Sequence, residues 1–218
     1  MSALNQLISE ILALPRGIRV VLADPPWLFR SNSLRAPGRN ARRHYGCLTV
    51  DELCRLPLPE RLAEDAALFL WVPGPFLVIG AHVPLMRAWG FEPTARAFAW
   101  AKLNARANPA LFTSDDFHMG PGLTTRKNVE DVILGKRGKS LRRNSSVREL
   151  IIAPRREHSR KPHTTHERIE RYVGSQGPFL ELFARQSRPG WITLGDEATK
   201  FDPPCSMKEA LMREDARH

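Results

Sequence analysis

One short segment constrains the fold more than any other. The apolar, largely β-branched run 18–24 ends directly in Pro25-Pro26-Trp27. A strand that is apolar on both faces is typical of the buried interior of a parallel sheet. Two prolines cannot continue a regular element, so the strand must stop at Asp24. This acid is therefore predicted at the carboxyl end of a buried strand, where α/β proteins bind their ligands.

Similar apolar runs recur along the chain and are separated by helical patterns. Further strands are predicted over 66–72, 94–102, 129–134, 148–153, 179–184 and 191–195. Helices are predicted within 1–17, after the N-cap Thr49, over 76–89 and over 166–173. Glycines at 135 and 138 predict a hairpin or tight turn after the strand predicted over 129–134. This alternation indicates an α/β fold with a mostly parallel sheet. The length fits one domain, 1–218, with a flexible tail over 202–218.

The positive charge is concentrated in two segments. The chain has a formal net charge of +10. Residues 28–50 contain five arginines and no acid, and residues 122–171 contain 14 Lys or Arg against 6 Asp or Glu. This pattern favours a phosphate backbone as partner, although solvated basic loops are the alternative. A membrane-surface protein is disfavoured, because the arginines lie in loops such as 28–46 and not along one amphipathic helix.

Cysteine and histidine usage points to a reducing compartment without a metal. The three cysteines are odd in number and form no C-x-x-C pair, so we expect a cytoplasmic protein without a disulfide framework or zinc site. His158, His163 and His166 are close in sequence but lack cysteine neighbours, and are interpreted as solvated or nucleic-acid-facing. We predict neither a signal peptide nor a membrane span. No glycine-rich phosphate motif is present, which disfavours NAD-type and P-loop chemistry.

The segment Asp24 to Trp27 offers groups suited to an exocyclic amine. A flat base could stack on Trp27 while the Asp24 carboxylate and a proline carbonyl, that of Pro25, accept its two amine protons. We expect the prolines to leave such carbonyls without competing local donors. Acceptors outside the ring plane favour a tetrahedral nitrogen, so the lone pair is ready to attack a sulfonium methyl group. The base must first leave its stack. The alternative is a strand exit that the prolines merely stiffen.

The surrounding blocks carry a resemblance to a known family. They are VVLADPPW at 20–27; Tyr45-Gly46 with Thr49, Asp51, Glu52 and Leu53; 68–72; Trp100, Lys102 and Asn104; Thr125–Asn128 with Glu130, Leu134, Gly135 and Gly138; Ser159, Lys161 and Pro162 before Ile169-Glu170; 181–185; and 190–195. In this order they resemble the DPPW-type adenine N6-methyltransferases. The resemblance spans roughly 18–200.

This resemblance implies a circularly permuted Rossmann-like fold and S-adenosylmethionine as cofactor. It implies the following roles: Asp24, Pro25, Pro26 and Trp27 catalytic; Asp24, Lys161, Glu181, Arg185, Asp196 and Glu197 at the cofactor; and Tyr45, Arg42, Arg43, Arg126 and Lys127 at the substrate. Lys161 would hold the cofactor carboxylate, and Glu181 and Arg185 would lie at the ribose. Positions 196 and 197 would contact the cofactor adenine. No metal is expected.

Alternatives remain for several of these residues. Glu181 and Arg185 could be a simple ion pair, and Lys161 could contact phosphate. The family often has Asn where this chain has Asp196, and Tyr where it has His166. Four tryptophans are interpreted as core: Trp71, Trp89, Trp100 and Trp191.

The resemblance favours DNA over RNA, because compact stand-alone relatives are mostly restriction- or phage-associated. A cytosine amino-methyltransferase and a non-catalytic nucleic-acid-binding subunit are the alternative functions. A protein partner and a homo-oligomer are both compatible with the sequence.

Overall fold

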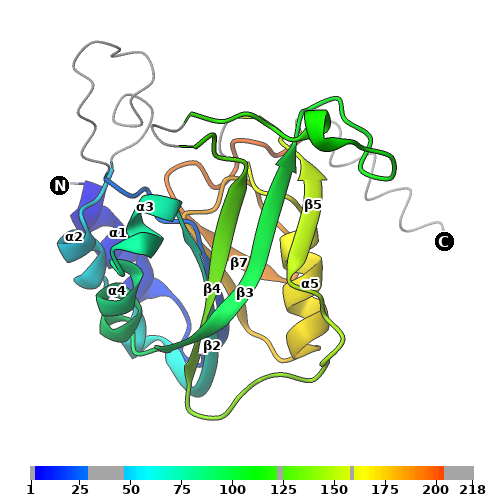
Figure 1. Ribbon diagram of the computed structural model, residues 1–218. Helices are drawn as coiled ribbons and strands as arrows, with labels where there is room; N and C mark the ends of the chain where they lie inside the picture. The colour runs from blue at the N-terminus through cyan, green and yellow to red at the C-terminus, as the bar shows by residue number, and fades with distance from the viewer. Residues whose placement is uncertain (1–2, 29–46, 122–124, 158–159, 204–218) are drawn as a thin grey trace.

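The computed structural model describes residues 3–28, 47–121, 125–157 and 160–203 (Figure 1). Nearly all of the predicted basic loop 28–46 and of the predicted tail 202–218 lies outside the described residues. The described strands are β1 (Ile18–Ala23), β2 (Leu62–Val72), β3 (Glu92–Leu103), β4 (Val129–Arg137), β5 (Leu150–Pro154), β6 (Phe179–Leu182) and β7 (Trp191–Leu194). The helices are α1 (Ala3–Ala13), α2 (Val50–Cys54), α3 (Gly74–Val78), α4 (His82–Ala88) and α5 (Thr164–Val173), with 3-10 turns at Leu58–Glu60 and Ser114–Asp116.

All seven described strands form one mixed sheet in the order β5-β3-β4-β2-β1-β6-β7. Neighbours are parallel except at β4, which runs antiparallel to both β2 and β3. The predicted α/β class and mostly parallel sheet are therefore confirmed. The turn predicted at 135–138 is wrong, because β4 continues to Arg137 and the left-handed residue is Gly138, with φ 60°. Gly135 lies within the strand, where a Cβ would come 2.6 Å from Met86 Cε of α4.

Helices cover both faces of the sheet, so the molecule has three layers (Figure 1). Alternate residues of β1 supply the two cores: Val21 points to one face and Val20 to the other. The first core packs against α1, α2 and α4. The second packs against α5 through Ile169 and Val173. β1 is buried on both sides, which explains its continuous apolar sequence.

The helices match the sequence patterns with one exception. Thr49 caps α2 in a reciprocal capping box with Glu52, as predicted. The single helix predicted over 76–89 is instead two short helices, α3 and α4. Gly80 separates them in the left-handed conformation at φ 69°, which an uninterrupted helix does not allow. The four tryptophans interpreted as core are all buried.

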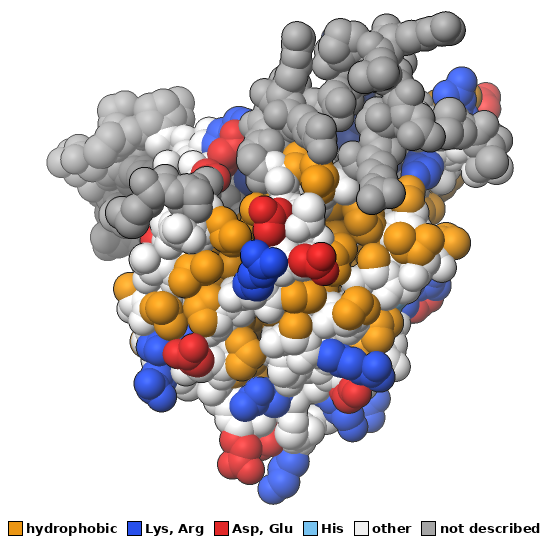
Figure 2. Space-filling model, turned by 90° about the vertical axis from the view of Figure 1, so that its left-hand side faces the viewer, with side chains coloured by type: hydrophobic (Ala, Val, Ile, Leu, Met, Phe, Trp, Pro, Cys, Tyr) orange, Lys and Arg blue, Asp and Glu red, His pale blue; other side chains and the backbone are white. Residues whose placement is uncertain are grey.

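Figure 2 shows the side of the molecule that carries the N-terminal helices, where apolar side chains lie between charged ones. At the end of α3, Val78 and Ile79 expose 86% and 74% of their surface. Among the described residues, no helix has the length and apolar character that a membrane crossing requires.

Candidate active site

Charged side chains meet at the edge of the sheet where the parallel strands end. Asp24 follows β1, and Lys102 is the second-last residue of β3. Lys161 lies between β5 and α5. Because β4 runs in the opposite direction, its second residue, Glu130, starts a strand at the same edge. Four segments that are distant in sequence therefore bring carboxylates and ammonium groups together.

These four side chains form a ladder of alternating charge. The Lys161 Nζ donates to Asp24 Oδ2 at 2.8 Å and to Glu130 Oε2 at 3.2 Å. Lys102 in turn donates to the other oxygen of Glu130. The side chains of Asp24, Lys161 and Glu130 are only 21%, 15% and 30% exposed, so solvent screens these pairs weakly. An ammonium has three N–H groups, and two of those on Lys161 are used here.

Burial and neighbouring charge shift the pKa values within the ladder. Burial raises the pKa of Asp24 above its ordinary value, although Lys161 opposes this shift. Burial acts in the same direction on Glu130, but Lys161 and Lys102 together outweigh it and lower the pKa of Glu130 to about 2. For Lys161, burial favours the neutral amine, yet Asp24 and Glu130 outweigh burial and raise its pKa. Asp24 is thus the more basic of the two carboxylates.

The prolines and the tryptophan after Asp24 are held by local hydrogen bonds. Pro25 O accepts the Trp27 N–H at 2.8 Å, and Pro26 O accepts the Leu48 N–H at 2.9 Å. The prediction that the proline carbonyls lack competing donors is therefore wrong, although a carbonyl oxygen retains a second lone pair. The indole of Trp27 is 3% exposed, donates to Trp71 O at 3.1 Å and packs against Phe76. In this structure the ring belongs to the core and does not present a face to a base.

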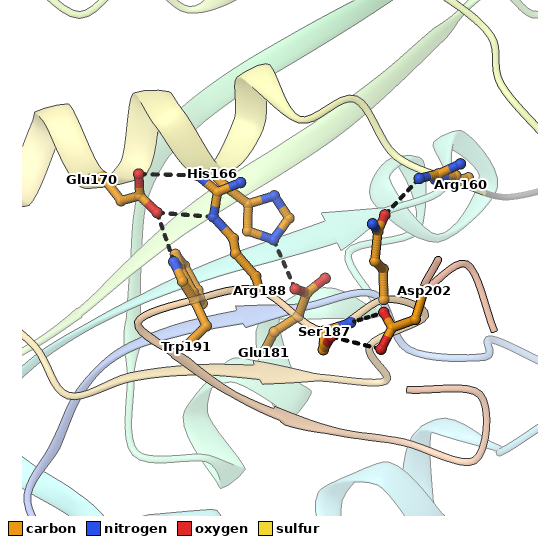
Figure 3. A network of polar contacts seen from close by, with 9 residues as sticks. Arg160, His166, Glu170, Glu181, Ser187, Arg188, Trp191 and Asp202 are labelled. Carbon is orange, nitrogen blue, oxygen red and sulfur yellow. Dashed lines mark hydrogen bonds and ion pairs between the residues drawn. The ribbon is translucent and has the colours of Figure 1, made fainter. Parts of the chain in front are cut away.

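A pocket of about 190 Å³ opens beside the ladder, between the segment before α5 and the loops after β6. Its walls include Asp24, Lys161, His166, Glu181 and Arg185. His166 Nε2 and Glu181 Oε2 lie 2.7 Å apart, so the imidazole donates to the carboxylate (Figure 3). The ring of His166 also meets Trp191 edge-on at 5.0 Å. The expectation that His166 is solvated is therefore wrong: it is buried and orients an acid in the pocket wall.

The floor of the pocket depends on an unusual backbone conformation after β6. Phe183 has φ 62°, the left-handed region that is costly for a side chain with a Cβ. Gly195 lies against this turn, where a Cβ would approach Phe183 Cα to 2.9 Å. Beyond it, Ser187 donates through its N–H and Oγ to Asp202, at 2.7 and 2.6 Å (Figure 3). These contacts hold the segment after β7 against the loop after β6.

Comparison with known proteins assigns the family. The model of the MT-A70 family matches residues 18–197, which is most of the chain. The chain belongs to the MT-A70 family. This family consists of adenine N6-methyltransferases that use S-adenosylmethionine, so the expected family, reaction and cofactor are confirmed. A nucleic-acid substrate follows from the family as well.

Individual relatives differ in how much of their own length is matched. The chain is 29% identical over 211 residues to the type II methyltransferase M.MunI of Mycoplasma sp, covering 88% of this chain and 83% of that protein. It is 28% identical to the N6-methyladenosine RNA methyltransferase MTA1 of Cryphonectria parasitica, covering 85% and 53%. It is 32% identical to the human N(6)-adenosine-methyltransferase catalytic subunit METTL3, covering 82% and 28%. The chain thus spans about half or less of these two eukaryotic relatives.

The pocket residues of this MT-A70 chain suit the parts of S-adenosylmethionine. Lys161 offers a cation for a carboxylate, and Glu181 offers oxygens for hydroxyl groups. The aromatic rings of Phe183 and Phe201 supply apolar surface. The volume is below the roughly 300 Å³ at which small-molecule sites usually begin, so the described pocket encloses part of such a ligand. The remaining part would extend towards the ladder and solvent.

Not every predicted cofactor residue lines this pocket. Asp196 is exposed, whereas Glu197 is half-buried and pairs with Arg185 at 3.6 Å and with Lys200. Neither Asp196 nor Glu197 is among the pocket-lining residues. Of the two residues considered as an ion pair, Glu181 is bonded to His166 and Arg185 pairs with Glu197.

The predicted substrate residues are only partly described. Tyr45, Arg42 and Arg43 lie outside the described residues. Arg126 and Lys127 are exposed just before β4, at the same edge of the sheet as the ladder. No group of three or more potential metal ligands is found within the part of the chain that the structure describes.

Sequence reasoning did not assign three residues of the site: Glu130, Lys102 and His166. Glu130 and Lys102 were already part of the matched blocks, but the direction of β4 was needed to bring them to Asp24. The signal that could have found them is a pair of opposite charges at two predicted strand ends. His166 lies on the buried face of an amphipathic helix, one turn before Ile169, which is a pattern visible in sequence.

Proposed function

We propose that this chain transfers a methyl group from S-adenosylmethionine to the exocyclic N6 of adenine in DNA, with Asp24 contacting the target amine. The observation that carries the proposal is that Asp24 belongs both to the charge ladder and to the pocket wall. It is therefore the one described carboxylate that both lines the proposed cofactor pocket and is held by Lys161. The family supplies the reaction, and this geometry supports the choice of Asp24.

Asp24 acts by accepting a hydrogen bond from the amine. Its pKa is raised, which makes its carboxylate a stronger acceptor than a solvated one. The second lone pair of Pro25 O is the proposed acceptor for the other amine proton, at an angle to the first. Two such acceptors draw the nitrogen lone pair out of the ring system and towards attack. S-adenosylmethionine, when bound, supplies the activated methyl group.

Lys161 and Glu181 are proposed to hold opposite ends of the cofactor. The third N–H of Lys161, which neither Asp24 nor Glu130 uses, is proposed to bind the cofactor carboxylate. Glu181 is oriented by His166, so its free lone pairs can accept the ribose hydroxyls. Arg185 and Glu197 are proposed beside the ribose and adenine, with Asp196 at the adenine.

We propose that Trp27 positions the backbone of the site and does not stack on the target base. Its buried indole fixes the backbone that follows Asp24 through the bond to Trp71 O, so the proline carbonyls keep a defined position. Stacking and closure over the base are proposed for Tyr45 with Arg42 and Arg43. Arg126 and Lys127 are proposed phosphate contacts.

The preference for DNA rests on similarity. M.MunI is matched over 83% of its length, which fits a compact chain of this type. We also propose the circular permutation. β1 comes first in the chain, whereas β6 and β7 come last, yet β6 lies beside β1 in the sheet. A cytoplasmic, single-domain protein is also proposed, on the length of the chain and its odd cysteine count, and it can act alone or with a partner.

The test is transfer of tritium from labelled S-adenosylmethionine to unmethylated DNA and RNA in parallel. The products are digested and the labelled nucleoside is identified. We expect N6-methyladenine from DNA, and loss of at least about 100-fold in rate with Asp24→Ala. Asp51→Ala, an exposed acid on α2, is the matched control and should keep full rate.

Each other outcome changes one part of the proposal. Label in RNA alone overturns the choice of DNA, and label in cytosine overturns the choice of base. Cofactor binding by calorimetry without any transfer would indicate a non-catalytic subunit. Full activity of Asp24→Ala would reject the role of Asp24.

A further inference from the structure

Arginines gather at the end of α5 that is remote from the active site. The connection from β4 to β5 contains four basic residues and a single acid, Glu149. It passes the C-terminal end of α5 at the bottom of Figure 1, whereas β3, whose second-last residue is Lys102 of the ladder, ends at the top. We define the arginine surface as Arg19, Arg142, Arg143, Arg148, Arg168 and Arg171.

Contacts within the arginine surface leave its charge uncompensated. Arg19 and Arg143 both donate to Gln176 Oε1 at 3.3 Å, so two guanidinium groups share one neutral oxygen. Arg168 donates to two backbone carbonyls, those of Arg148 and Leu150, at 2.6 and 2.7 Å. Arg171 donates to the Ser146 hydroxyl at 3.4 Å. These acceptors satisfy hydrogen bonds but remove no net charge.

The acids nearest to the arginine surface are largely engaged elsewhere. Glu149 pairs with Arg96 of β3 at 2.9 Å. Glu170 binds Arg188 and the Trp191 indole, on the other side of α5. Glu167 is exposed and only partly offsets Arg168, whose pKa is lowered by burial and then by Arg148. Like charges therefore crowd one another, which an added polyanion would relieve.

The loop that carries these arginines is fixed to the body of the protein. Leu141 is buried in the second core, and its carbonyl accepts from Gln176 Nε2 at 2.8 Å. The backbone N–H groups of Arg143 and Asn144 both donate to Tyr172 O, at 2.8 and 3.3 Å. The side chain of Asn144 then accepts the Ser146 N–H at 2.8 Å. Such a frame presents charge with little loss of backbone entropy on binding.

We propose that the arginine surface is a second phosphate-binding site. It binds backbone phosphates of the substrate nucleic acid at some distance along the strand from the target base. This inference rests on the proposed function, since it takes the same nucleic acid as partner. α5 has ten residues and is about 15 Å long at 1.5 Å per residue. Phosphates of one strand are spaced about 3.4 Å apart, so the two ends of α5 are separated by roughly four or five nucleotides.

The experiment removes charge from this surface while keeping side-chain length and polarity. Arg142→Gln, Arg148→Gln and Arg171→Gln are combined in one variant of the full chain. The matched control combines Arg16→Gln, Arg55→Gln and Arg87→Gln, which lie near α1, α2 and α4. Binding to a fluorescent 30-base-pair duplex of mixed sequence is measured by anisotropy between 50 and 300 mM NaCl. Binding to vesicles containing phosphatidylserine is measured in parallel.

We expect the slope of log Kd against log salt to fall by roughly 2 to 3 in the first variant and by less than about 0.5 in the control. The rate at saturating DNA should be unchanged, while KM for DNA rises. Equal slopes for the two variants overturn the inference, as does a loss confined to vesicle binding. A changed slope without any methylation by the wild-type chain overturns the proposed function alone.

Discussion

The two ends of α5 hold charge in opposite ways. At its N-terminal end, buried groups alternate in sign from Asp24 through Lys161 and Glu130 to Lys102. At its C-terminal end, four of the six arginines donate to neutral oxygens, and most of the six are exposed. The difference shows what burial requires. A buried charge must have a partner within the protein, because its desolvation is otherwise too costly. An exposed charge stays hydrated and can remain unpaired until a ligand binds.

The comparison predicts opposite responses to the removal of a cation. At the buried end, Lys161→Met leaves Asp24 and Glu130 without their shared partner. We expect the free energy of unfolding to fall by about 3–5 kcal/mol, measured by urea denaturation. Methyl transfer should fall with it. Lys136→Met, an exposed lysine of β4, is the control, and an equal loss in both variants would contradict the ladder.

Lowering the pH should reduce the free energy of unfolding through the protonation of Glu130, at the buried N-terminal end of α5. The pKa of Glu130 is about 2 in the folded chain against an ordinary 4.5, which corresponds to roughly 3 kcal/mol of stability. Because the folded pKa is the lower one, this stability is complete above about pH 5 and is lost as the pH falls towards 2. Asp24 acts in the opposite direction, since its pKa is raised and folding favours its protonated form.

The Glu130 contribution is therefore isolated by comparing wild type with Glu130→Gln. Unfolding by urea is followed at pH 7, 5, 3.5 and 2.5. The stability advantage of wild type should shrink steadily below pH 5. An advantage that stays constant across this range would show that Glu130 does not carry the effect.

A smaller loss of stability is expected from a substitution at Glu170 of α5. Glu170 accepts two hydrogen bonds from Arg188 and one from Trp191 Nε1 at 2.7 Å. Glu170→Gln removes its charge and one acceptor oxygen, so we expect a loss of roughly 1–2 kcal/mol in unfolding free energy. Thermal denaturation with Glu167→Gln as control measures it, because Glu167 is the exposed acid one turn away. Equal midpoints for the two variants would contradict this role.

The smallest predicted effect is a gain in stability rather than a loss. Arg148→Gln removes a charge that crowds Arg168 but leaves the Arg148 carbonyl in place as an acceptor. We expect stability to rise by about 0.2–0.5 kcal/mol at low ionic strength and to return to the wild-type value in 0.5 M NaCl. A stability loss that is insensitive to salt would show that this end is not strained by like charges.

The sequence predicted the strands better than their direction. Each predicted strand exists, because apolar runs such as that of β1 report burial on both faces directly. The reversal of β4 was not predictable, since direction depends on the connections and not on the pattern of the strand. That reversal is what brings Glu130 to Lys161. Gly80 dividing α3 from α4 was likewise missed, because a glycine within a helical pattern is often tolerated.

The candidate site was predicted in part for the same reason. The position of Asp24 followed from local chemistry, since prolines end a strand wherever they occur. The partners of Asp24 came from elsewhere in the chain, and only Lys161 was expected through resemblance. The burial of Trp27 depends on tertiary packing against Phe76, which no local pattern contains. The burial of His166 follows the amphipathic pattern of α5, but its contact with Trp191 does not.

The reversed strand also decides where such a protein can diversify. Because β3 ends and β4 begins at the same edge, the described parts of their connection, 104–121 and 125–128, start and finish beside the active site, and none of their residues belongs to either core. Lengthening a connection costs little, about 0.6 kcal/mol for each doubling. Insertions there could change which sequence is read while the catalytic body stays intact. The architecture thus separates an edge that can accept insertions from the constant chemical centre.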